Sequence, residues 1–303
     1  MPAHPLSRRD FLVTSSAALT GLAFDSTSPA ATPPPGQKFA IITFTKPFQT
    51  LSFDETADLV AEVGYHGIEC PVRKNGQVLP ERVEDDLPKL QSALKRRQLD
   101  LTLLATDVGS VTPLHEKLLR TAAALGVKRY RLTSFHYDLN KPIPPQLAEI
   151  KSRLRDVAAL NKQLGIYGGI QNHSGRDNVG APIWDIHQLV ADIDPAHLGI
   201  CFDIGHATLE GGYSWQIQAK LMEPLLTAVF VKDFSWKKNA TKGWAADWGP
   251  LGEGMVNRKF FDWLKTTSYK GPISQHCEYL KGGGPEERAQ MKKDLAVLQS
   301  WLS

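Results

Sequence analysis

Polar side chains follow three short apolar segments of the sequence. The first segment, 198–203 (LGICFD), ends at Asp203, and His206 comes three residues later. The other two segments end in the same way. Gln171 ends 166–171 and His173 comes two residues later, and His276 and Glu278 lie at the end of 272–278. Carboxylates and imidazoles can bind metal ions or transfer protons. Since parallel α/β folds place their chemistry at the carboxyl ends of strands, these residues predict a functional site.

The alternation of side chains along a strand adds a fourth segment to this site. On 227–233, Phe230 and Lys232 share one parity and Asp233 has the other. Only residues of one parity point into the mouth of a barrel. We therefore expect Lys232 to join the site and Asp233 to be a structural partner.

The elements that must position these residues alternate eight times along the chain. β-rich runs are expected at 39–45, 67–70, 99–106, 127–133, 166–171, 198–203, 227–233 and 272–278. Helical spacing is expected near 54–62, 87–97, 113–125, 146–164, 183–191, 215–221, 258–265 and 286–302. Eight strand-helix units with short connections predict an α/β fold, a closed (β/α)8 TIM barrel. An open sheet of six or seven strands is the alternative.

The start of the chain has the composition of an export signal. Ser7-Arg8-Arg9-Asp10-Phe11-Leu12 precedes an apolar run of small residues, which predicts a bacterial twin-arginine signal. Pro33-Pro34-Pro35 belongs to a breaker-rich linker, which argues against an amphipathic first helix. We expect residues 1–36 to be signal and linker, residues 37–303 to be one catalytic domain, and the product to be periplasmic or secreted. That domain is close to the ~250 residues of a typical barrel.

Composition excludes several classes of protein. The chain is 42% hydrophobic and 22% charged, which is typical of a globular domain. Its net charge of +3 comes from scattered lysines and arginines, so nucleic acid is not an expected partner. No segment after the signal is long and apolar enough to be a membrane span. We expect the three cysteines to be buried thiols.

Taken together, the motifs resemble those of one family. They occur in the order Gln-Asn-His (171–173), Asp-Ile-Gly-His (203–206), Phe-Val-Lys-Asp (230–233), Leu-Gly-Glu-Gly (251–254) and Gly-Pro-Ile-Ser-Gln-His-Cys-Glu-Tyr (271–279). This set is similar to that of the xylose isomerase-like TIM barrel superfamily, the sugar phosphate isomerases and epimerases. The resemblance implies one divalent metal ion, held by glutamate, aspartate, histidine and glutamate from strands five to eight.

Only the aspartate of that ligand set, Asp203, is unchanged here. Gln171, Phe230 and His276 stand where the other three ligands are expected. Gln171, Asp203 and His276 are still competent ligands for one divalent ion such as Mn, Mg, Co or Zn. With one negative charge instead of three, such a site would bind the ion more weakly and leave it a stronger Lewis acid. A site that has lost its metal is the alternative.

Five residues near the mouth are candidate catalytic acids and bases: Glu69, His173, His206, Lys232 and Glu278. Proton transfer needs a group whose pKa can be set near neutrality, and histidine needs little tuning. Any one of the five could instead be an orienting residue. As a group they favour an enzyme.

Aromatic residues indicate where a substrate would bind. The stretch 235–257 is predicted to be a long loop, and it contains Trp236, Trp244 and Trp248. Tryptophan offers flat apolar faces that can cover sugar rings, and long loops are often lids. We expect Trp236, Trp248 and His136 to bind substrate. A subunit interface is the alternative for the tryptophans.

The resemblance implies an exported, metal-dependent sugar isomerase or epimerase that abstracts a proton next to a carbonyl and forms an enediolate. The altered ligands leave open a lyase that eliminates the aglycone from a 3-keto-glycoside. A non-catalytic carbohydrate-binding barrel is a further alternative. We expect a small carbohydrate substrate, and a homo-oligomer would be common for such barrels.

Overall fold

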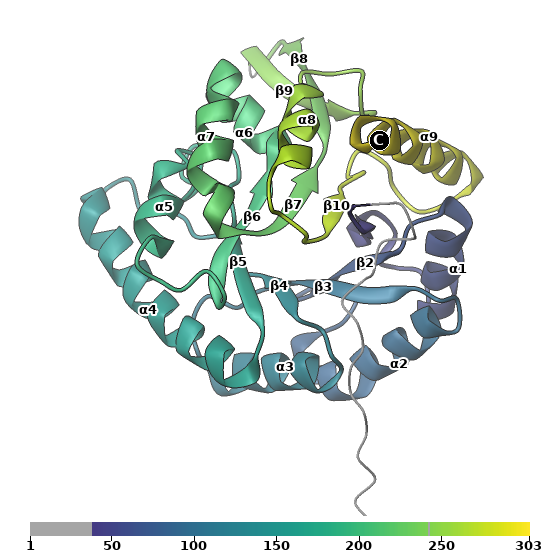
Figure 1. Ribbon diagram of the computed structural model, residues 1–303, viewed down its shortest axis with the longest axis horizontal. Helices are drawn as coiled ribbons and strands as arrows, with labels where there is room; N and C mark the ends of the chain where they lie inside the picture. Colours follow the sequence, from purple (N-terminus) through teal and green to yellow (C-terminus); the bar gives the residue numbers. More distant parts are fainter. Residues whose placement is uncertain (1–37, 242) are drawn as a thin grey trace, which may run out of the picture.

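Eight parallel strands close into a barrel in the computed structural model, which describes residues 38–241 and 243–303 (Figure 1). Around the barrel the strands follow the order β1, β10, β7, β6, β5, β4, β3, β2. Their bounds are β1 (Ile41–Phe44), β2 (Gly67–Val72), β3 (Asp100–Thr106), β4 (Arg129–Arg131), β5 (Tyr167–Gln171), β6 (Leu198–Asp203), β7 (Leu226–Val231) and β10 (Ile273–Gln275). The predicted (β/α)8 fold is confirmed, and the open sheet is excluded because β1 pairs with both β2 and β10. The predicted signal at residues 1–36 lies outside the described residues.

Helices surround the ring of strands (Figure 1). They are α1 (Phe53–Val63), α2 (Val83–Lys95), α3 (Pro113–Ala124), α4 (Ile143–Leu164), α5 (Trp184–Val190), α6 (Ile204–Gly211), α7 (Trp215–Met222), α8 (Lys259–Thr266) and α9 (Pro285–Leu302). Short 3-10 turns occur at η1 (Lys46–Phe48), η2 (Pro80–Arg82), η3 (Gly212–Ser214) and η4 (Glu223–Leu225). Within the described part of the chain, none of the helices combines the length and apolar character needed to cross a bilayer.

Local sequence sets where these helices begin and end. Ser52 and Glu55 form a capping box at the start of α1, and Gly64 ends that helix with a φ of 102°. Thr112 caps α3 by accepting the backbone N–H of His115. The Asp203 side chain caps α6 by accepting the backbone N–H of His206, so this short helix begins directly at the end of β6.

The core has two parts, and the smaller one lies inside the barrel. Ile42, Leu103, Cys201, Ala228 and Phe230 form this inner cluster and are fully buried. A larger apolar cluster fills the space between strands and helices. All three cysteines are free and buried, as predicted.

The stretch 235–257 was predicted to be a loop, and this is wrong for most of its length. It begins as an antiparallel hairpin of β8 (Asp233–Asn239) and β9 (Gly243–Gly249), with Trp248 opposite Phe234. Alternating side chains place the aromatic residues of both strands on one face of the hairpin. Asp233 fixes the chain after the hairpin, because its carboxylate accepts the backbone N–H groups of Gly252, Gly254 and Val256 at 2.9–3.0 Å. This is the structural role expected for Asp233.

Candidate active site

A ring of charged and polar side chains lies at or after the carboxyl ends of the barrel strands, except that Glu69 lies in the middle of β2. Each member contacts the next, and the members come from β2, β4, β5, β6, and the segments after β7 and β10. In order they are Glu69, Arg131, Gln171, Asp203, Lys232, Glu278 and His276. Strands β7 and β10 end earlier than predicted, so Lys232, His276 and Glu278 follow the strands instead of ending them.

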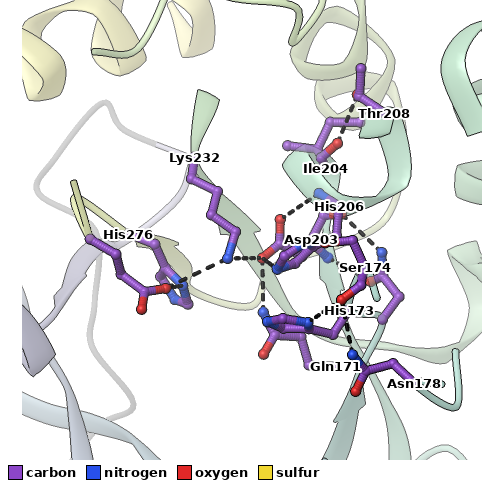
Figure 2. Close-up of polar contacts among 12 residues, drawn as sticks. Gln171, His173, Ser174, Asn178, Asp203, Ile204, His206, Thr208, Lys232 and His276 are labelled. Carbon is purple, nitrogen blue, oxygen red and sulfur yellow. Dashed lines mark hydrogen bonds and ion pairs between the residues drawn. The ribbon is translucent and has the colours of Figure 1, made fainter. Parts of the chain in front are cut away.

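The Asp203 carboxylate is the centre of one half of this ring. Arg131 Nη1 donates to Gln171 Oε1, and Gln171 Nε2 donates to Asp203 Oδ2 at 2.8 Å. Lys232 Nζ lies 3.2 Å from the same Asp203 oxygen. Figure 2 shows Lys232 and Gln171 approaching that carboxylate from different sides.

His276 is the centre of the other half. Its Nε2 donates to Glu69 Oε2 at 2.8 Å, and its Nδ1 lies 3.7 Å from Glu278 Oε1. Glu278 Oε1 is in turn 3.6 Å from Lys232 Nζ. Arg131 Nε lies 3.7 Å from Glu69 Oε1, and this contact closes the ring.

The ring balances its charges inside a buried environment. Burial favours the neutral form of Glu69, but His276 and Arg131 outweigh burial and lower the pKa of that carboxyl. Burial acts in the same way on Asp203, and Lys232 and the histidines lower its pKa far below the usual range. Burial opposes the charge of His276 too, but Glu69 and Glu278 raise its pKa above 6.5. The ring therefore favours ionised carboxylates facing a lysine, an arginine and an imidazolium.

The three predicted metal ligands do not fit a divalent cation in this arrangement. Gln171 Oε1 accepts from Arg131, and Asp203 Oδ2 is paired with the Lys232 ammonium. His276 points Nε2 at Glu69 and carries a proton there. Among the described residues, no three His, Cys, Asp or Glu side chains gather into a group that could hold a metal ion. Metal ligands must present free lone pairs, and here protonated groups use them.

The fourth ligand position of the resemblance is filled by an apolar ring. Phe230 is fully buried, and its ring lies 4.5 Å from the ring of His276 and 5.9 Å below the Arg131 guanidinium. It supplies packing and a π-face for a cation, and no lone pair.

His173 is the candidate base with an available nitrogen. Its Nδ1 donates to the Ser174 carbonyl at 2.8 Å, so the proton of the neutral ring is on Nδ1 and Nε2 keeps its lone pair. Burial and the nearby Lys232 lower the pKa of His173 below 6.5. The ring packs against the ring of His206, with centroids 3.9 Å apart and planes tilted by 41°. Figure 2 shows the two side chains next to each other. A neutral imidazole is therefore present beside the charged ring.

His206 is held in place more firmly. Its backbone N–H donates to Asp203 Oδ1 at 3.1 Å, and its Nδ1 bonds the Ser174 hydroxyl at 2.8 Å. Burial lowers the pKa of His206 well below 6.5. A Cβ at Gly205 would lie only 2.7 Å from the Lys232 carbonyl oxygen, so glycine lets α6 start this close to Lys232. These contacts make His206 a residue that positions Asp203 and His173.

Of the three residues predicted to bind substrate, the structure brings Trp248 to the ring. Lys232 Nζ lies 4.9 Å from its indole centroid, and the ring of His206 is 5.1 Å away. Trp236 is exposed and packs edge-on against Phe234, one step further from the site. His136 is exposed and contacts Asp177. The geometry gives Trp236 and His136 no contact with the ring.

Arg131 is a site residue that the sequence analysis missed. It ends β4, is buried, and contacts both Gln171 and Glu69. The signal was a pair of arginines, Arg129 and Arg131, that share parity on the predicted strand 127–133.

Comparisons with known proteins agree with this architecture. A family model described as the xylose isomerase-like TIM barrel matches residues 57–301. A search of curated proteins found no match to the chain.

Solved structures share the fold at low sequence identity. The 3-keto-D-glucoside 4-epimerase of E. coli has 15% identity and a TM-score of 0.66 over 86% of this chain and 99% of that one. A probable 3-DHS dehydratase of Bacillus anthracis has 18% identity and a TM-score of 0.64 over 86% and 99%. A D-psicose 3-epimerase has 13% identity and a TM-score of 0.63 over 87% and 99%. At these identities the likeness concerns the fold.

Proposed function

The chain belongs to the xylose isomerase-like TIM barrel family, and on that premise we propose that it is a carbohydrate-acting enzyme that removes a proton from the carbon next to a sugar carbonyl. One observation carries the proposal: the neutral imidazole of His173 lies beside a buried ring that contains fixed cations. Proton abstraction of this kind needs a base for the C–H bond and positive charge for the oxygen that becomes negative. The similar structures named 3-keto-D-glucoside 4-epimerase and D-psicose 3-epimerase support a sugar as substrate.

His173 is the base in this proposal. Nε2 takes the proton, and the Nδ1–H bond to the Ser174 carbonyl holds the ring and its tautomer. The electron pair of the C–H bond moves into an enediolate, whose negative oxygen faces the Lys232 and Arg131 cations of the ring. Trp248 lies against Lys232 and offers its indole face to the sugar. Because the predicted metal ligands are engaged with each other and with cations, no step is assigned to a metal.

The other four acid-base candidates are held in contacts. Glu69 accepts from Ser274 and His276, and the Ser174 hydroxyl bonds His206 Nδ1. His206 Nε2 has no hydrogen-bond partner within 38–241 and 243–303, but it is buried and lies 3.7 Å from Asp203 Oδ2. Lys232 lies between two carboxylates, and Glu278 is paired with both Lys232 and Lys46. Inverting a carbon centre through an enolate requires a second group on the opposite face, whereas a one-base reaction does not.

This shortage of a second free base favours a one-base reaction. The two candidates are isomerisation by proton transfer on one face and β-elimination of the aglycone from a 3-keto-glycoside. In the elimination, His173 takes the proton, and the electron pair forms the enolate. Collapse of the enolate expels the aglycone oxygen, which receives the same proton back from His173 as it leaves. The similar structure named as a probable 3-DHS dehydratase is compatible with such chemistry on this fold.

The test is incubation of the purified protein with free sugars and 3-keto-glycosides in deuterated water. Mass spectrometry follows deuterium uptake, and chromatography follows release of the aglycone. Deuterium uptake into a free sugar supports isomerisation. Release of the aglycone from a 3-keto-glycoside, with or without deuterium in the sugar product, supports the lyase. Binding of sugars without either signal would make the chain a carbohydrate-binding barrel and overturn the proposal.

We also propose export through the twin-arginine route, on the strength of Arg8 and Arg9 ahead of an apolar run. Fractionation of cells that express the full chain tests this. The domain should reach the periplasm or medium, and replacing Arg8 and Arg9 with lysine should retain it in the cytoplasm. Equal distribution of both proteins would contradict export. Association of copies stays a prediction.

A further inference from the structure

We infer that the Lys232 ammonium takes the place of a metal ion in this site, so that the protein stabilises negative oxygen with its own fixed cation. The inference rests on the proposed function for the role of that charge. The exclusion of a divalent ion by Lys232 stands on the geometry alone.

Lys232 is buried and is fixed by contacts on several sides. Its side chain is 7% exposed, with Nζ 3.2 Å from Asp203 Oδ2 and 3.6 Å from Glu278 Oε1. The indole of Trp248 lies 4.9 Å away and limits access from another side. An ammonium has three N–H donors, and these two carboxylates leave one for a substrate oxygen. The two carboxylates and the indole therefore fix the position of the ammonium, and its remaining N–H can donate to a substrate oxygen.

The partner of Lys232 is fixed in turn. Asp203 Oδ1 is committed to the backbone N–H at the start of α6, and Oδ2 also accepts from Gln171. The ammonium therefore does not need to reorganise when charge develops on the substrate, which is the condition for effective electrostatic stabilisation.

Arg131 places a second fixed positive charge at the same mouth. Its guanidinium lies 5.4 Å from the ring of Phe44 and 5.9 Å from the ring of Phe230. These aromatic faces stabilise the cation. One of them belongs to Phe230, the position at which the resemblance implies a metal-binding histidine. A divalent ion bound to Asp203 would lie next to Lys232, whose Nζ is 3.2 Å from Asp203 Oδ2, and like charges at such range repel.

The geometry also indicates what removal of the lysine would do. In a Lys232→Ala protein, Asp203 Oδ2 and Glu278 Oε1 lose their shared cation and face a small void. Two carboxylate oxygens beside a void are donors that Mn²⁺ accepts. The wild-type chain should reject the ion that this variant can take.

The experiment compares three full-length proteins: wild type, Lys232→Ala, and the control Lys237→Ala, which removes an exposed lysine of the hairpin. Calorimetric titration with MnCl₂ should show no detectable heat of binding for wild type or control and clear binding by Lys232→Ala, with an affinity at least tenfold above the detection limit. After treatment with EDTA, wild type and control should keep their deuterium exchange. Lys232→Ala should lose about 100-fold or more, and added ethylammonium, which fits the void, should restore part of it.

Tight Mn²⁺ binding by the wild type, or activity that EDTA removes and Mn²⁺ restores, would overturn the inference. Undiminished exchange in Lys232→Ala would overturn it as well. If no sugar exchanges with any protein, the proposed function fails, and the Mn²⁺ titration still decides whether Lys232 excludes the metal. Circular dichroism of the three proteins checks that each is folded.

Discussion

The Asp203 carboxylate serves the fold and the site at once. One oxygen caps α6, and the other accepts from Gln171 and pairs with Lys232. Because the residue is fully buried, its charge is tolerated only through these partners. At the scale of single residues, stability and electrostatics therefore depend on the same group.

Asp203→Asn should lower the free energy of unfolding by about 3 kcal/mol, since it leaves the buried Lys232 charge with one partner fewer. Asparagine keeps the capping ability at α6. Chemical denaturation measures the loss. Asp192→Asn is the matched control, because Asp192 is an exposed partner of Lys151 and Arg155, and it should cost below about 1 kcal/mol. Equal losses for the two variants would contradict the central position of Asp203.

His173→Gln should lower kcat/KM by about 100-fold or more while the fold is kept, since only the base is removed. In the wild type, burial and Lys232 hold the pKa of His173 below 6.5, so the neutral ring predominates from pH 6.5 upward. The pH profile of kcat/KM should therefore decline on the acidic side with a midpoint below pH 6.5. A decline with its midpoint above pH 7 would show that another group is the base.

Two elements shape the mouth beyond the eight strand-helix units. The short helix α6 starts at Asp203 and aligns His206 beside His173. The β8–β9 hairpin carries Trp248 to Lys232. At the scale of elements, these two additions convert an ordinary barrel end into a specific site.

Trp248→Ala should raise KM about fivefold, because an indole face against a sugar contributes on the order of 1 kcal/mol. Trp244→Ala is the control on the same face of the hairpin, and its indole is 66% exposed. That variant should leave KM unchanged. Equal KM values for Trp248→Ala and wild type would remove Trp248 from the substrate site, and an effect confined to Trp244→Ala would place the sugar further out.

The alternation of apolar runs and helical spacing predicts most of the barrel, but it does not predict α6 or the β8–β9 hairpin. The eight apolar runs separated by helical spacing are sufficient to indicate closure. The helix α6 escaped prediction because its start depends on a cap from the last residue of a strand. The hairpin escaped because its strands are short and contain polar and small residues, so the stretch has the composition of a loop. Pairing between strands is a tertiary property that local sequence shows only weakly.

The whole molecule should be most stable near pH 6.5 as far as its histidines are concerned. His206 has a lowered pKa, so the unfolded chain binds more protons below pH 6.5 and stability is lost on acidification. His276 has a raised pKa, so its stabilising charge is present below pH 6.5 and lost as pH rises through the higher value.

Denaturation at about pH 5.5, 6.5 and 8 tests this prediction. We expect the highest free energy of unfolding at the middle value. His276→Gln should flatten the alkaline side and His206→Gln the acidic side. A steady increase in stability from the lowest to the highest pH would contradict the assigned directions for His276.

For the site as a whole, the sequence identifies most members of the ring and misassigns their roles. Glu69, Gln171, Asp203, Lys232, His276 and Glu278 were all expected near the mouth. Residue types alone made Gln171, Asp203 and His276 look like ligands, because the contacts of each depend on partners distant in sequence. Gln171 lies 40 residues from Arg131, and His276 lies 207 residues from Glu69. Arg131, which the sequence analysis missed, decides which way the Gln171 amide faces.

The most direct test of the central claim is loss of deuterium from a substrate labelled at the carbon next to the carbonyl. NMR would follow the label in ordinary water with wild type and with His173→Gln. The account predicts that the wild type releases the label to solvent and that His173→Gln does so about 100-fold or more slowly. Full retention of the label during wild-type turnover, or equal release by both proteins, would contradict it.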